Sequence, residues 1–230
     1  MRVLALDTAT EACSVALIDG SAVIGRYAEV GRGHAEEVLA MVDAVLGEAG
    51  IPLRRLNGIA AGVGPGSFTG VRISVSVAQG LAFGAGLPVI PVSSLEALAW
   101  CAIGEGAGQA LACLDARMGE VYWGCFAADA VRGLALLGAL QVGPAPTVRW
   151  VGAVPYRGIG RGFAAYPELA ALPGLALAPR DAQALPDARD LARLGALRLE
   201  AGEGLDPAAL KPQYVRDKVA LTEAERRASK

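Results

Sequence analysis

The chain has 230 residues, of which 53% are hydrophobic, and this is enough for one large or two small hydrophobic cores. The formal net charge is −2, which argues against a broad basic face that binds nucleic acid unaided. The four cysteines form no CxxC pair and there is a single histidine, so we predict no metal site. The opening segment MRVLALDT reaches an acidic residue too early for a secretory signal, so we expect a cytoplasmic protein with reduced thiols.

The first 103 residues are predicted to alternate strands and helices. Three strands at residues 2–6, 12–18 and 22–30 form a meander, and a helix from His34 to Ala49 follows and ends at Gly50. A strand at 56–63, a helix at 71–85, a strand at 88–92 and a helix at 95–101 complete this half. The order βββαβαβα predicts a mixed sheet with helical crossovers.

The segment GVGPGSFTGVR, at residues 62–72, joins the fourth strand to the second helix and concentrates four glycines and a proline. A helix N-terminus beside a glycine loop is typical of anion sites, and Ser67 or Thr69 is a candidate N-cap. Neither the Walker nor the GxGxxG spacing is present. Ligand binding and close packing of strand on helix both remain open. The candidate residues of this glycine loop are Gly64, Pro65, Gly66, Ser67, Phe68, Thr69, Gly70 and Arg72.

Arg72 is the only charged residue between Arg55 and Glu96. Prolines and glycines interrupt this stretch, so a membrane span is not expected, and either the core or another protein must cover it. We expect backbone carbonyls or a carboxylate to hold the Arg72 guanidinium, because burial of an unpaired charge is costly.

The two long helices of this half are the candidate partner-binding surface. The second helix carries a bulky stripe, Ile73, Val77 and Leu81, which we predict to pack on the sheet. Its second stripe consists of small residues, which allow close approach of another helix, either the 34–49 helix or a helix of a partner. Two such helices per chain would build a four-helix interface. The candidate partner-binding residues are His34, Val38, Met41, Val42, Val45, Ser76, Gly80 and Gly84.

The second half, residues 104–230, opens with the same pattern as the first. LALDTATEACSVAL and LACLDARMGEVYWG each end a strand in an aspartate, Asp7 or Asp115, and continue into a second strand. This suggests a diverged internal duplication, although each aspartate could instead brace its own turn. A helix at about 188–201 and a mixed-charge tail from Lys211 complete this half.

Paired hairpins that end in aspartate resemble the actin-like ATPase superfamily, in which the two hairpins flank nucleotide phosphates. More specifically, six segments in order over nearly the whole chain resemble the bacterial TsaB (YeaZ) family: LALDTATEACSVAL, HAEEVL, GVGPGSFTGVRISVSVAQGLA, PVIPVSSLEALA, LDARMGEVYWG and PQYVR. The resemblance implies an α/β actin-like fold with two related lobes, residues 1–103 and 104–230, each with a mixed sheet and crossover helices.

The resemblance also implies a function. It implies a non-catalytic subunit that acts with TsaD and the ATPase TsaE to place threonylcarbamoyl on N6 of the adenosine next to the tRNA anticodon. TsaD would be its heterodimer partner and a second copy its partner when alone. Contact with tRNA would be indirect, and no cofactor is expected.

Two departures agree with a lost activity. Asp7-Thr8-Ala9-Thr10 has alanine where actin-like kinases have the glycine of Asp-x-Gly-Thr, so Asp7, Thr8 and Asp115 are interpreted as vestigial phosphate hairpins. His34 is followed four residues later by Val38, whereas TsaD-type proteins have an HxxxH metal pair, so His34 is expected to cap a helix or contact a partner. An actin-like small-molecule kinase and a metalloprotease-like protein are the alternatives.

Overall fold

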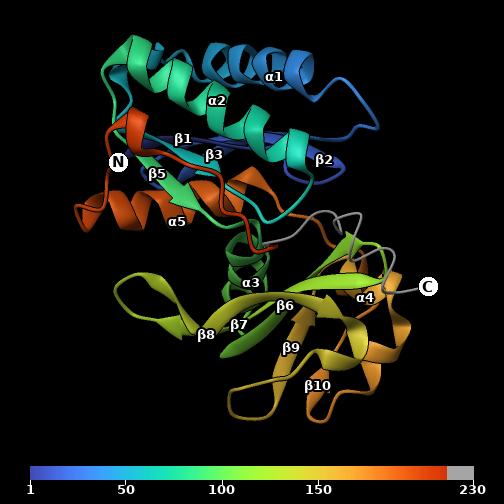
Figure 1. The fold of residues 1–230 in the computed structure, drawn as a ribbon. Helices are drawn as coiled ribbons and strands as arrows, with labels where there is room; N and C mark the ends of the chain where they lie inside the picture. Colours follow the sequence, from blue (N-terminus) through green and yellow to red (C-terminus); the bar gives the residue numbers. More distant parts are fainter. Residues whose placement is uncertain (217–230) are drawn as a thin grey trace.

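The computed structural model describes residues 1–216, which form two five-stranded sheets joined by helices (Figure 1). The first sheet has the strand order β3-β2-β1-β4-β5. Its strands are β1 (Arg2–Asp7), β2 (Ala12–Asp19), β3 (Ala22–Glu29), β4 (Gly58–Gly62) and β5 (Val89–Val92). β1, β2 and β3 pair antiparallel, as the predicted meander requires, and β4 and β5 extend the sheet in parallel.

Helices cover both faces of the first sheet. α1 (His34–Ala49) and α2 (Phe68–Ala85) lie side by side on one face, and α5 (Ala188–Glu200) lies on the other (Figure 1). Ser67 is the N-cap of α2, since its Oγ accepts a hydrogen bond from the Gly70 N–H at 2.9 Å. α2 therefore begins three residues before the predicted start.

The second sheet repeats the antiparallel hairpin followed by a parallel strand, in the order β10-β9-β6-β7-β8. Its strands are β6 (Gln109–Arg117), β7 (Glu120–Asp129), β8 (Gly133–Pro144), β9 (Tyr156–Ile159) and β10 (Leu175–Ala176). α3 (Ser94–Gly104) packs on it and α4 (Gly162–Ala165) follows β9. The two mixed sheets with their helices confirm the predicted α/β actin-like fold.

The two halves of the chain exchange helices. α5, predicted to belong to the second lobe, packs against β1, β2 and β4 of the first sheet, whereas α3 packs against β6 of the second. α5 packs closely on the first sheet, since a Cβ on Gly195 of α5 would lie 2.6 Å from the Cβ of Ala60 in β4. One core cluster thus contains residues of both sheets, such as Val3 and Phe126. The boundary between residues 103 and 104 stays a prediction.

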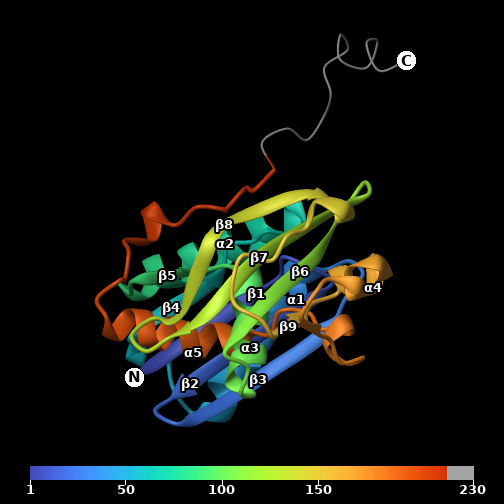
Figure 2. The ribbon, with the colours of Figure 1, turned by 90° about the horizontal axis from the view of Figure 1, so that it is seen from below.

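The segment after α5 returns to the α2 side of the first sheet (red in Figures 1 and 2). The Gln79 side-chain amide of α2 donates to the carbonyls of Pro207 and Leu210 at 3.0 and 3.1 Å. The Gln213 N–H donates to the Val63 carbonyl at 2.8 Å. These bonds bring residues 213–216 beside the glycine loop. Most of the predicted mixed-charge tail lies outside the described residues.

Candidate functional site: an interlobe cleft and a helix face

A cleft of about 680 Å³ lies between the two lobes. Both Asp-ended hairpins, the glycine loop, the first residue of α1 and residues 213–216 line it. It therefore occupies the place at which the hairpins of an actin-like protein would flank phosphates. Its lining includes Glu11, His34, Gly66, Arg117, Arg161 and Tyr214.

In the first hairpin, the Asp7 carboxylate points into the protein. Its Oδ1 accepts the Ala9 N–H at 2.6 Å and its Oδ2 accepts the Ser94 hydroxyl at 2.8 Å. Burial raises the pKa of Asp7, and the bonds from Ala9 and Ser94 oppose that rise. A Cβ on Gly62 of β4 would lie 2.1 Å from the same carboxylate. Asp7 thus ties β1 to the start of α3 and does not line the cleft.

The glycines of the loop allow the hairpin and α2 to touch. A Cβ on Gly66 would lie 2.2 Å from the carbonyl oxygen of Ala9, and one on Gly70 would lie 2.0 Å from that of Thr8. The Ser67 N–H donates to the Ala9 carbonyl at 2.7 Å, and the Thr8 hydroxyl donates to the Gly70 carbonyl at 2.7 Å. Of the two interpretations left open by the sequence, close packing accounts for these glycines.

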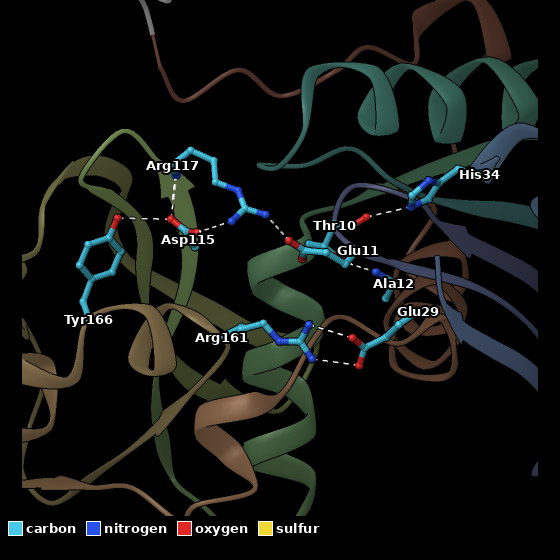
Figure 3. A network of polar contacts seen from close by, with 9 residues as sticks. All are labelled: Thr10, Glu11, Ala12, Glu29, His34, Asp115, Arg117, Arg161 and Tyr166. Atoms are coloured by element: carbon cyan, nitrogen blue, oxygen red, sulfur yellow. Dashed lines mark hydrogen bonds and ion pairs between the residues drawn. The ribbon is translucent and has the colours of Figure 1, made fainter. Parts of the chain in front are cut away.

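In the second hairpin, Asp115 braces its own turn (Figure 3). Its Oδ1 accepts the Arg117 N–H at 2.8 Å and its Oδ2 accepts the Arg117 guanidinium at 2.9 Å. The Tyr166 hydroxyl adds a bond to Oδ1 at 3.3 Å. Arg117 and Met118 both have left-handed backbone angles, with φ of 61° and 57°. The carboxylate therefore stabilises a tight turn.

Two ion pairs cross from one lobe to the other (Figure 3). Arg117 reaches Glu11 of the first hairpin, and Arg161 binds both carboxylate oxygens of Glu29 at 2.9 Å. Arg161 lowers the pKa of Glu29. His34 lies within 3.0 Å of the Thr10 carbonyl through Nε2, so it closes the helix onto the hairpin. Because Glu11 and Glu29 neutralise the guanidiniums of Arg117 and Arg161, these two cations are less available to bind an anionic ligand in the cleft.

We expected backbone carbonyls or a carboxylate to hold the Arg72 guanidinium. This expectation was wrong. Its side chain is exposed, and no carboxylate of residues 1–216 forms an ion pair with it. Its guanidinium carbon lies 3.2 Å from the centroid of the Phe68 ring and 5.3 Å from that of Tyr214. Because the first turn of α2 faces solvent, the Arg72 guanidinium does not need the backbone carbonyls that a buried charge would need. It stacks on aromatic rings instead.

Most of the predicted partner residues on α1 cannot contact a partner. Val38, Met41, Val42 and Val45 are buried against the first sheet. Regular apolar spacing marks the face of an amphipathic helix that packs on its own core, which is why this prediction was wrong. His34 is half-buried at the cleft, and Leu39 is the large apolar side chain that α1 exposes.

The small stripe of α2 is not covered by any other part of residues 1–216. Ser76, Gly80 and Gly84 are exposed, and a Cβ on either glycine would meet nothing within 4 Å, so the stripe does not seat α1. The bulky stripe is half-buried at the edge of the packed face. The centre of that face consists of smaller residues that the sequence did not single out: Val71, Ser74, Val75, Ala78 and Ala82.

Residues 1–216 contain no group of three histidine, cysteine, aspartate or glutamate side chains that could hold a metal ion. Likewise, none of the helices described there combines the length and apolar character needed to cross a bilayer.

The fold and cleft define a two-lobed α/β protein of the actin-like class. Similarity to known proteins then identifies its family. Residues 28–132 match the family model of TsaD, tRNA N6-adenosine threonylcarbamoyltransferase. The tRNA threonylcarbamoyladenosine biosynthesis protein TsaB of Escherichia coli (strain K12) is 39% identical over 232 residues, covering 96% of each chain. TsaB of Haemophilus influenzae is 47% identical over 135 residues, covering 57% of this chain and 56% of that one.

A solved structure from Pseudomonas aeruginosa agrees. It is described as an uncharacterized protein with similarity to peptidase YEAZ, and it superposes with a TM-score of 0.86 at 42% identity, covering 94% of this chain and 99% of that one. A second, YeaZ from the same organism, superposes with a TM-score of 0.84. The chain belongs to the TsaB (YeaZ) family, and its role lies in tRNA threonylcarbamoyladenosine biosynthesis.

Proposed function

We propose that this chain is a non-catalytic, cytoplasmic subunit that pairs with TsaD, is joined by the ATPase TsaE, and supports transfer of threonylcarbamoyl to N6 of the adenosine next to the tRNA anticodon. The observation that carries this proposal is the arrangement of the first hairpin, whose aspartate is turned into the protein and does not line the cleft. The backbone of Thr8 packs closely against Gly70, and that of Ala9 packs closely against Gly66. The Asp7 carboxylate is buried and accepts hydrogen bonds from Ala9 and Ser94.

The exposed face of α2 supports the pairing. Ser76, Gly80 and Gly84 leave a shallow strip along the helix, next to which Phe83 is 84% exposed. A helix of a partner can approach such a strip closely and gain dispersion contacts along its length. The same strip would pair two copies of this chain when TsaD is absent, since an isologous contact needs only one self-complementary patch.

The two alternatives have less support. A small-molecule kinase of this class would need its first-hairpin aspartate at the cleft, whereas Asp7 is buried and bonded to Ser94. A metalloprotease would need clustered ligands, and residues 1–216 contain no group of three.

The experiment is a reconstitution with purified TsaD, TsaE and tRNA. We expect the chain to co-elute with TsaD in size-exclusion chromatography, and threonylcarbamoyl transfer to stop when the chain is omitted. In calorimetry, the isolated chain should show no ATP binding at micromolar affinity. Ala9→Gly is the matched variant: it removes the Cβ, but Asp7 stays bonded inside, so ATP binding should not return. ATP binding or turnover by the isolated chain, or failure to pair with TsaD, would contradict the proposal.

A further inference from the structure

Three side chains with flat faces, Phe68, Arg72 and Tyr214, form a stacked cluster, and the two aromatic residues line the cleft. The two rings lie 6.2 Å apart at an interplanar angle of 25°, and the Arg72 guanidinium lies over the Phe68 ring. Phe68 is 61% exposed and Tyr214 is 52% exposed. The two rings therefore leave part of their surface exposed to solvent.

Among residues 1–216, no carboxylate forms an ion pair with the cation of this cluster. Most arginines near the cleft have acidic partners: Arg117 binds Glu11, and Arg216 binds Glu120. Arg72 has no such partner among residues 1–216. Arg32, which follows the cleft residue Gly31, has none within that range either. The cluster thus combines stacked aromatic rings with a guanidinium that has no carboxylate partner among residues 1–216.

The cluster is held in place before any ligand arrives. Tyr214 follows Gln213, whose N–H donates to the carbonyl of Val63, and Gln79 holds the preceding turn at Leu210. Phe68 is the first residue of α2, next to its N-cap Ser67. Preorganised side chains lose little conformational entropy on binding, so their contacts contribute more fully to affinity.

Aromatic rings beside a guanidinium without a carboxylate partner in residues 1–216 match the chemistry of a single-stranded nucleotide. A base stacks on a ring or on an arginine plane, and its phosphate pairs with the cation. Paired bases in a helix have no free face, so the ligand must be an unpaired nucleotide. A net charge of −2 for the chain limits the contact to this locality.

We propose that the stacked cluster binds one unpaired nucleotide of tRNA in the assembled complex. This inference rests on the proposed function, because the complex brings the tRNA to this chain. It differs from the sequence expectation that tRNA is contacted only through the partner. The base stacks on the exposed rings of Phe68 and Tyr214, and Arg72 pairs with the phosphate.

The experiment measures tRNA binding by the complex with TsaD, using fluorescence anisotropy of labelled substrate tRNA at fixed salt. Phe68→Ala and Tyr214→Ala should each weaken binding roughly 5- to 150-fold, the usual effect of losing one stacked base. Tyr214→Phe keeps the ring and should bind like the wild type. Arg72→Gln should reduce the slope of log K against log salt by about 0.7 to 1, as expected for one lost phosphate contact. Val131→Ala removes an exposed apolar side chain from the turn between β7 and β8, outside both the cluster and α2, and should leave tRNA binding unchanged.

Each variant is first checked for melting temperature and for co-elution with TsaD. Loss of tRNA binding by a folded, assembled variant supports the proposal. Unchanged tRNA binding by both alanine variants overturns it. Loss of TsaD binding by the alanine variants would show that the cluster contacts protein, which overturns it as well. The wild-type complex reports separately on the proposed function, because its assembly and its tRNA binding are measured independently of the cluster.

Discussion

Gly80→Leu is the sharpest test of the exposed strip on α2. A Cβ at Gly80 meets nothing within 4 Å, so the isolated protein should accommodate the side chain. Replacing glycine inside a helix also improves helix propensity, so we expect the free energy of unfolding to rise by about 0.5–1 kcal/mol. In the complex, the leucine would hold the two helix axes apart. Overpacking of a tight contact costs about 1–3 kcal/mol, which corresponds to roughly a 5- to 150-fold loss of affinity for TsaD.

The assay combines thermal unfolding of the isolated variant with titration against TsaD. Gly104→Leu is the matched control, because Gly104 is also an exposed helical glycine with open space around it, at the end of α3 rather than on α2. It should also stay folded, and it should bind TsaD normally. A Gly80→Leu variant that is folded and binds TsaD with wild-type affinity would refute the assignment of the small stripe to the interface.

Two further predictions concern stability. Gly70→Ala should lower the free energy of unfolding by about 2 kcal/mol or more, because its Cβ would lie 2.0 Å from the Thr8 carbonyl oxygen. The melting temperature should fall by roughly 4–8 °C. An unchanged Tm would show that the first hairpin can move away from α2 without loss of stability. Burial raises the pKa of Asp190 from 3.8 to about 6, so the folded state binds its proton more tightly than the unfolded state, and stability falls as the pH rises through that range. Asp190→Asn should therefore be more stable than the wild type at pH 7–8, by up to about 2 kcal/mol, and lose this advantage near pH 4 in urea unfolding. An equal difference at both pH values would contradict that reasoning.

The sequence alone was sufficient to predict those features that depend on residues close together in the chain. Apolar spacing and Gly50 located α1, Ser67 located the start of α2 to within one turn, and the order of motifs identified the family. The crowding of glycines between residues 62 and 70 marked the segment at which the hairpin and α2 meet. Such signals are local, because helix periodicity, caps and glycine conformations are set by the chain within a few residues.

Only the tertiary structure decided which surfaces are free and which charges meet. Apolar spacing on α1 showed where the helix is apolar, but that face packs on its own sheet and is unavailable to a partner. Arg117 and Glu11 are separated by 106 residues, and Arg161 and Glu29 by 132, so no local pattern could pair them. Arg72 is exposed because that position of α2 faces solvent. Side-chain exposure and long-range pairing depend on how whole elements pack, and that packing is set by the complete core rather than by any one segment.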